Sequence, residues 1–379
     1  MKKLLIASAV SAAFAAPTLA LAQAARAPTL SQVLDASGLN VSGYVDAGFS
    51  YANRNVEAGG FSDRVFDSQN NSFALHQFGL QVAKQPTRGF GGVVNITAGS
   101  DAQVIHAFPE QTAVATSLFD VTQAYGQYAS GSLTLMAGKF VTLAGSEVIW
   151  SPSNGNFSRS ILFGAIPFTH TGVRAGYAVS NTVTLYGGIN NGWDQLTDAN
   201  KGKTLELGAS LTPIRPLTIN ITGYFGKESA AAKGAPAAAP VPQDQRQLLN
   251  VVANYTINNR MSAGGEVLYV SQDRAAGSAK YNGLAGYFTY NLNREWRVAA
   301  RAETFDDKNN FHFNSGSVAA GTDVKYNEIT ATLAYTPSSS VELRGEVRGD
   351  RSDKNVFINS NGSTAKTLQT FGLQGIYKF

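Results

Sequence analysis

Residues 341–350 read Val-Glu-Leu-Arg-Gly-Glu-Val-Arg-Gly-Asp, so apolar or small side chains alternate with charged ones. Successive side chains of a β-strand point to opposite faces, and this order therefore gives one apolar and one polar face. The same period of two recurs at 41–51, 217–225 and 247–257. Half-apolar strands repeated along the chain predict an all-β protein.

The composition supports strands and excludes several classes of function. The 379 residues include 38 Gly, 21 Phe and 15 Tyr, which suit strands and tight turns better than helices. The chain has no Cys, and this removes disulfide frameworks, thiol catalysis and Cys-ligated zinc. Its formal net charge of +4 gives no electrostatic footprint for nucleic acid.

The first residues have the features of an export signal. Lys2-Lys3 precedes an apolar, small-residue stretch at 4–16, and Ala20-Leu21-Ala22 matches an A-x-A cleavage site. The sequence therefore predicts a secretory signal peptide at 1–22, with a cut after Ala24 as a close alternative. A transmembrane anchor is the competing interpretation, which the small-residue end of the stretch disfavours.

The connectors between strands alternate in length. No later segment has about 18 consecutive apolar residues, so a membrane role requires a closed barrel, the other structure that satisfies its backbone in lipid. Short turns rich in Pro, Gly, Asn or Ser alternate with long polar loops such as the Ala/Pro-rich 228–242. This alternation is typical of outer-membrane barrels with short periplasmic turns and long external loops. A soluble sandwich or propeller is the alternative, and it does not require the difference in loop length.

The number of strands follows from the connectors. Counting between them gives about 16 strands, with about 14 or 18 as alternatives, and an even number returns both termini to the periplasmic side. We expect a transmembrane antiparallel up-and-down β-barrel at 40–379, after a periplasmic N-terminal segment at 23–39. The expected strands are 40–52, 72–84, 89–101, 119–129, 132–141, 169–179, 182–190, 203–212, 216–226, 246–257, 260–270, 280–292, 295–305, 325–336, 340–350 and 367–379.

The last strand ends on an aromatic face. Phe371, Leu373, Gly375, Tyr377 and Phe379 share one side of it. A terminal Phe on such a strand resembles the signal that the outer-membrane barrel assembly machinery reads. We therefore expect Phe379, with Tyr377, to act in assembly and the protein to reside in the bacterial outer membrane.

Two parts of the chain resemble one family of barrels. Leu30–Gly38 and Val41–Asp46 resemble the start of the putative β-barrel porin family, the OmpL-like group. Gly145–Ile149, Asn154–Ser160 and Pro167–Arg174 resemble its central stretch. The resemblance implies an outer-membrane porin that passes small hydrophilic solutes or ions, with outer-membrane lipid around it. Monomer and homotrimer both remain open.

The sequence lacks several motifs that mark enzymes and metal sites. The four His are far apart without an H-E-x-x-H, and no G-x-S-x-G elbow is present. Gly202-Lys203-Thr204 lacks the first glycine of a phosphate loop. We expect no enzymatic activity, cofactor or metal site. A substrate-selective or plugged channel, and a structural, adhesive or enzymatic barrel, are the alternatives to a passive diffusion channel.

Strand parity places a set of charged side chains inside the barrel. Their signs are mixed, so they do not choose between anions and cations, and each has the alternative of a structural ion pair with a cross-strand neighbour. Many lie on the expected strands 295–305 and 340–350. The candidates are Asp46, Arg174, Glu206, Glu266, Arg297, Arg301, Glu303, Glu342, Arg344, Glu346 and Arg348.

The connector at 142–168 is the longest and the least polar. Its apolar side chains would form a large exposed patch outside the barrel, so we expect it to fold inside and narrow the pore. Glu147 and Arg159 are its ionisable residues and our candidates for the constriction, facing Arg174 on the wall. The alternative is that part of 161–168 extends the sixth strand.

Overall fold

The structure is a computed structural model, and it describes residues 29, 34, 36–54, 63–109, 117–229, 243–273, 277–319 and 321–379. The chain divides into two compact units, Met1–Leu39 and Asn40–Phe379. The expected signal peptide at 1–22, most of the segment at 23–39, and residues 230–242 of the Ala/Pro-rich connector lie outside the described residues. In the described part, helices are all too short or too polar to cross a membrane.

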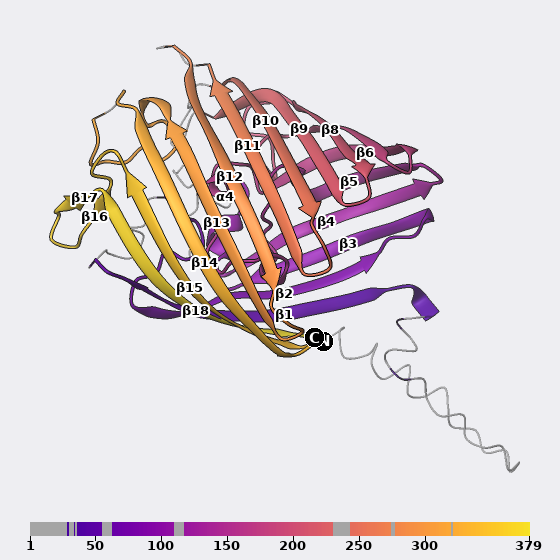
Figure 1. Ribbon diagram of the computed structural model, residues 1–379. Coiled ribbons are helices and arrows are strands. Elements are labelled where there is room, and N and C mark those ends of the chain that lie inside the picture. The colour runs from indigo at the N-terminus through magenta and orange to yellow at the C-terminus, as the bar shows by residue number, and fades with distance from the viewer. Residues whose placement is uncertain are drawn as a thin grey trace, which may run out of the picture. The chain divides into compact units, whose positions relative to one another are not determined.

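The second unit is a closed antiparallel barrel (Figure 1). Among the described residues, 16 strands follow one another around the ring, and β1 pairs with β18 to close it, which confirms the predicted fold. The barrel strands are β1 (Asn40–Ala52), β2 (Ser72–Lys84), β3 (Arg88–Ala98), β4 (Phe119–Ser130), β5 (Leu133–Val141), β6 (Thr169–Ser180), β7 (Val183–Asn190), β8 (Thr204–Ile214), β9 (Leu217–Ser229), β10 (Gln243–Thr256), β11 (Met261–Gln272), β12 (Ala279–Asn291), β13 (Trp296–Asp307), β14 (Val324–Ser338), β15 (Val341–Ser352) and β18 (Thr367–Lys378). A separate hairpin contains β16 (Phe357–Ile358) and β17 (Thr364–Ala365).

The strand boundaries agree with the expected ones within two residues except at two places, where they differ by three. β3 ends at Ala98 because Gly99, with φ 129°, turns the chain toward the short helix α3 (Ala102–Ile105). β9 and β10 extend further than expected because the ladder between them continues to the pair Ser229 and Gln243. Strand pairing thus takes up the first residues of the predicted loop 228–242.

The alternation of side chains separates the two faces of the barrel wall. On β14, Ile329 points outward and is 67% exposed, whereas its neighbour Glu328 points inward and is 4% exposed. A soluble sandwich would bury the apolar face instead. The outward apolar face matches a lipid environment, and the polar face lines the interior, which we call the lumen.

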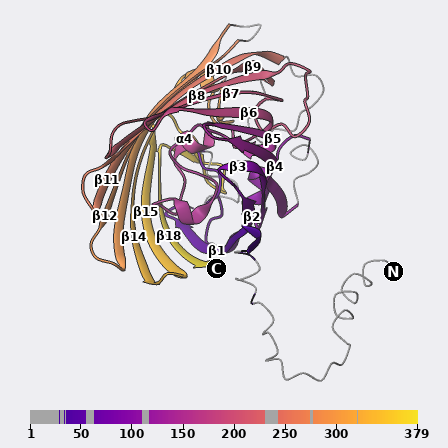
Figure 2. The same ribbon diagram turned by 90° about the vertical axis from the view of Figure 1, so that its right-hand side faces the viewer.

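The connectors distinguish the two ends of the barrel. Short turns, the start of β1 and the end of β18 lie at one end, here called the turn end, and the long connectors lie at the other, the loop end. The connector 142–168, called the inserted loop, runs into the lumen, and Figure 2 shows its helix α4 (Ile161–Gly164) inside the ring of strands. It does not extend β6, which begins at Thr169.

The inserted loop creates an apolar core inside the lumen. Ile161 and Leu162 of α4 are fully buried against wall residues such as Leu268 and Tyr281. The large side chains of the loop also need room at the wall. Phe157 lies against Gly372, where a Cβ would come within 2.7 Å of its ring.

Candidate functional site: the lumen and the inserted loop

The inserted loop is attached to the wall through its own backbone. Glu303 on β13 accepts hydrogen bonds from the first two amides of α4, at 2.7 and 3.1 Å. Glu346 on β15 accepts hydrogen bonds from the amides of Phe157 and Ser158, at 2.7 and 2.9 Å. Each carboxyl group thus accepts hydrogen bonds from two consecutive amides of the loop, and these four contacts fix the position of the loop.

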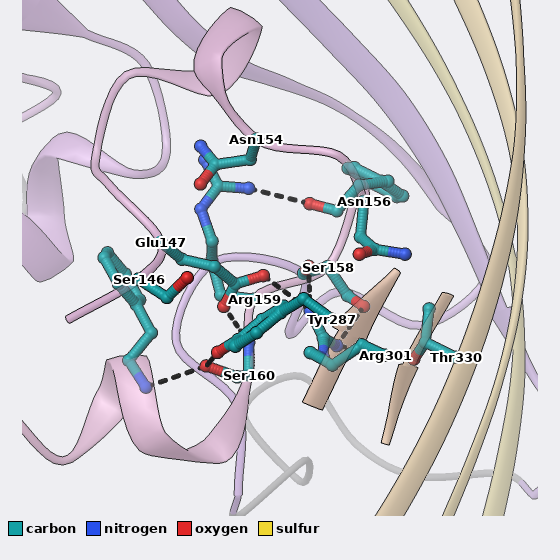
Figure 3. A network of polar contacts seen from close by, with 12 residues as sticks. Ser146, Glu147, Asn154, Asn156, Ser158, Arg159, Ser160, Tyr287, Arg301 and Thr330 are labelled. Carbon is teal, nitrogen blue, oxygen red and sulfur yellow. Dashed lines mark hydrogen bonds and ion pairs between the residues drawn. The ribbon is translucent and has the colours of Figure 1, made fainter. Parts of the chain in front are cut away.

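Arg301 is the centre of the network between loop and wall (Figure 3). Its guanidinium is fully buried and donates hydrogen bonds to Glu147 Oε1 at 2.7 Å, to the Ser158 carbonyl at 2.8 Å and to Glu328 Oε2 at 3.0 Å. One side chain of the wall therefore joins a carboxylate of the loop, a loop carbonyl and the next strand, β14. A charge buried this deeply is stable only with such partners.

The two ionisable residues of the loop are both buried. Glu147 is 7% exposed and also accepts a hydrogen bond from the Ser160 amide at 2.6 Å. Arg159 is 2% exposed, and its guanidinium donates to the carbonyls of Val148, Ile149 and Phe157 within the loop. Their role as the constriction stays a prediction, and the geometry adds a structural role to both.

The third predicted member of the constriction is engaged elsewhere. Arg174 on β6 forms a two-pronged ion pair with Glu206 on β8, and its guanidinium lies 4.2 Å from the centre of the Phe140 ring. Among the described contacts of Arg174, none is with Glu147 or Arg159. Glu147 is joined to Arg301 instead, and the place of Arg174 on the wall facing the constriction stays a prediction.

The other predicted lumen charges lie on the inner face, and each has a partner. Arg344 donates to the Asn156 carbonyl at 3.1 Å, and Arg348 donates to the Arg159 carbonyl at 2.6 Å. The remaining pairs are Asp46 with Gln374 at 2.8 Å, Glu266 with the Ser146 amide at 3.1 Å, and Arg297 and Arg344 with Glu342 at 2.6 and 2.8 Å.

Two wall acids were missed in the sequence. Glu328 pairs with Arg301, and Asp350 pairs with Arg348 at 2.7 Å. Both have the inward parity of their strands, so the same alternation could have identified them. We call the inward charged side chains of β11 to β15 the charged wall: Glu266, Arg297, Arg301, Glu303, Asp307, Glu328, Glu342, Arg344, Glu346, Arg348 and Asp350.

On the other side of the lumen, a stretch of wall with neutral polar side chains faces a cavity. A cavity of about 710 Å³ lies between the inserted loop and the inner face of β1 to β4 and β7 to β9, and it extends to Lys378 at the turn end. Its wall consists of amides, hydroxyls and a Tyr. We call these residues the neutral wall: Gln81, Asn95, Thr122, Gln123, Tyr186, Asn220 and Thr222.

The comparisons with known proteins agree with this architecture. A family model described as putative beta-barrel porin-2, OmpL-like, matches residues 38–379. The curated proteins contain no match to the chain. In the described part of the chain, no group of three or more His, Asp or Glu could hold a metal ion.

Solved outer-membrane proteins share the fold at low sequence identity. A loop L8 deletion mutant of OmpT, an outer membrane protein of Vibrio cholerae, has a TM-score of 0.61 at 11% identity over 90% of this chain and 99% of that chain. The outer membrane channel DcaP of Acinetobacter baumannii gives 0.59 at 13% identity over 90% and 97%. An anion-selective porin from Comamonas acidovorans gives 0.57 at 10% identity over 90% and 99%.

Proposed function

The chain belongs to the putative beta-barrel porin-2, OmpL-like family and is an outer-membrane porin, and we propose that it is a passive diffusion channel for small hydrophilic solutes or ions. The observation that carries the proposal is the inserted loop. A barrel of this size is too wide for its wall side chains to fill, so a loop fixed inside it determines the width of the passage. The loop leaves a cavity of about 710 Å³ on one side.

Conductance of the purified protein in a planar bilayer tests this function. We expect stable open steps without any added solute. A silent protein that inserts correctly would contradict a diffusion channel. Steps that stay blocked until one solute is added would indicate a selective or plugged channel instead, which the dense packing of the inserted loop favours as the second candidate.

Glu147 is the better of the two candidates for the constriction. It lines the cavity, whereas the guanidinium of Arg159 is held by carbonyls of its own loop. We therefore expect Glu147→Gln to lower cation preference and Arg159→Gln to change it less. Reversal potentials at low salt, where screening is weak, measure both. If neither variant changes the reversal potential, the inserted loop does not determine the ion selectivity of the channel.

We also propose the export and assembly steps that the sequence predicted. Residues 1–22 are removed during export, and the mass of the mature protein tests this cleavage. Phe379 exchanges two backbone hydrogen bonds of 2.9 Å with Gly43 and stacks against Phe78. Deleting Phe379 should reduce folded barrel in cells more than in detergent refolding, because the assembly machinery acts only in cells. An equal loss of folded barrel in cells and in detergent refolding would contradict a role of Phe379 as an assembly signal.

The remaining expectations concern partners and chemistry. We propose that the outward apolar face contacts outer-membrane lipid and that the barrel is not an enzyme. Monomer and homotrimer are the two candidate assemblies. The mass of the detergent-solubilised protein distinguishes monomer from trimer. A hydrolase screen with ester and peptide substrates tests the absence of enzymatic activity, and turnover by pure protein would contradict it.

A further inference from the structure

We propose that the cavity at the neutral wall is a binding site for neutral polyhydroxylated solutes of the size of a sugar. The inference rests on the proposed channel function and names the substrate class of that passage. A cavity of about 710 Å³ is within the range of sites that hold small organic molecules. Its lining, rather than its size, indicates the chemistry of the occupant.

The polar lining consists of groups that both donate and accept hydrogen bonds. Gln81, Asn95 and Gln123 are direct cross-strand neighbours on β2, β3 and β4, so three carboxamides form a row across the neutral wall. Hydroxyls of Thr122 and Tyr186 also line the cavity. A sugar hydroxyl likewise donates and accepts, so it can pair with every member of this row, whereas an ion uses only half of each carboxamide.

Asn95 supplies an independent observation. The residue is 3% exposed, and its Nδ2 has no hydrogen-bond partner among the described residues. Buried side-chain amides usually have their hydrogen bonds satisfied, and an exception at a cavity wall indicates a missing partner. A hydroxyl in the cavity would accept this hydrogen bond.

The other side of the cavity is aromatic. Trp150, Phe163 and Phe168 of the inserted loop line it, and Trp150 is only partly buried. The Trp150 ring is fixed by an edge contact with Tyr44, at 4.5 Å between the ring centres. A rigid aromatic surface opposite a row of carboxamides matches a sugar ring, which has C–H groups on its faces and hydroxyls around its edge.

The cavity offers little to a charged solute. Of its lining residues, Glu147 and Lys378 carry charge, Glu147 is paired with Arg301, and Lys378 lies 3.6 Å from Glu342. An ionised solute would give up hydration without a free counter-charge, and this is costly. The charged wall cannot compensate, because its groups are paired with the inserted loop or with other groups of the barrel.

Glucose and glucuronate test the inference, because they differ by one carboxylate on the same ring. We expect glucose to enter proteoliposomes at least about threefold faster than glucuronate in a swelling assay, because the carboxylate of glucuronate would lose hydration without a free counter-charge in the cavity. Asn95→Leu should slow glucose entry by about fivefold, which corresponds to one neutral hydrogen bond of about 1 kcal/mol. Asn282→Leu, the same change on the outward face of β12, is the control.

Binding is measured directly with Trp150. The chain has three Trp, so Trp193→Phe with Trp296→Phe leaves Trp150 as the single reporter. Glucose should change its fluorescence saturably, and glucuronate should not. If Asn95→Leu fails to assemble, Asn220→Leu on the same wall replaces it in the swelling assay.

The outcomes separate this inference from the channel itself. Equal entry of both sugars, or faster entry of glucuronate, would overturn the neutral-solute site while ion conductance still supports a porin. Absence of both conductance and swelling in correctly folded protein would instead overturn the channel. Faster glucose entry together with saturable Trp150 quenching supports the site.

Discussion

The two walls of the lumen use polar side chains for different purposes. The charged wall, on β11 to β15, donates to and accepts from the inserted loop, while the neutral wall faces a cavity. A loop buried in a barrel has backbone amides and carbonyls that water cannot reach, and these groups need partners. The comparison teaches that a dense set of charges inside a pore can serve the structure of the loop rather than the solute.

The first way to break this comparison is to remove the central charge. Arg301→Met leaves Glu147 and Glu328 buried without their guanidinium, and loss of one partner of a buried pair costs about 3–5 kcal/mol. Urea unfolding of the reconstituted barrel measures this. The control is Arg297→Met, whose side chain is 26% exposed and whose partner Glu342 keeps Arg344 at 2.8 Å. An equal cost for both variants would mean that Arg301 is not the centre of the network.

At the loop end of the barrel, the buried carboxyl of Asp63 is neutralised by a proton rather than by an arginine. Burial, and then the charge of nearby Asp350, raises the pKa of Asp63 to about 8 from its ordinary 3.8. Arg348, Arg64 and Asp67 face the same cluster, and Arg64 bonds both Asp67 and Asp350 at 2.6 Å. Asp63, in the connector between β1 and β2, is thus kept neutral, whereas its neighbours Asp67 and Asp350 are both paired with Arg64.

The sign of the pH effect follows from that pKa. Between about pH 4 and pH 8 the folded protein holds a proton on Asp63 that the unfolded chain has lost, so the free energy of unfolding falls as the pH rises through this window. Asp63→Asn should flatten that part of the curve. Because Asn is nearly the same shape as the protonated, neutral Asp that it replaces, we expect a smaller effect than for Arg301→Met. Unchanged pH dependence in Asp63→Asn would exclude this residue as its source.

Much of the fold was readable from alternation alone. Strands such as 340–350 put charged residues at every second position, and this predicted both the strand and its inner face. The boundaries failed where pairing or a single backbone angle decides, as at Gly99 and at the pair Ser229 and Gln243. Such details depend on a neighbouring strand that the local sequence does not identify.

The site was predictable only in part. Apolar content indicated that the loop 142–168 folds inside, because side chains like Phe157 and Leu162 need cover. The ion pair of Glu147 was not predicted, since Arg301 is 154 residues away and no spacing rule relates them. The row of Gln81, Asn95 and Gln123 was not predicted, because carboxamides carry no charge to mark them on the inner face.

Two glycines on β18 sharpen the comparison between inner and outer faces. Gly372 faces the inserted loop, and a Cβ there would lie 2.7 Å from the Phe157 ring. Gly375, three residues on, faces outward, and its nearest atom would be 3.7 Å away. Overpacking a tight contact costs about 1–3 kcal/mol, so Gly372→Ala should destabilise the barrel and Gly375→Ala should not. Urea midpoints measure both, and equal midpoints would place Phe157 elsewhere.

The smallest expected effects come from exchanging the character of the two walls. Glu346→Gln keeps the shape of a side chain that accepts hydrogen bonds from Phe157 and Ser158, but it removes the charge. Since charge-assisted hydrogen bonds exceed neutral ones by about 1 kcal/mol, the barrel should lose about that much stability. Its ion selectivity should hardly change, because Glu346 is 4% exposed and meets no solute.

The opposite change is Gln123→Glu, which puts a free charge at the cavity. Cation preference should therefore rise, while stability stays within about 0.5 kcal/mol. Reversal potentials and urea unfolding are measured on both variants, so that each has one value for ion selectivity and one for stability. A selectivity change in Glu346→Gln with none in Gln123→Glu would reverse the assignment of the walls, because solute would then pass along the charged side.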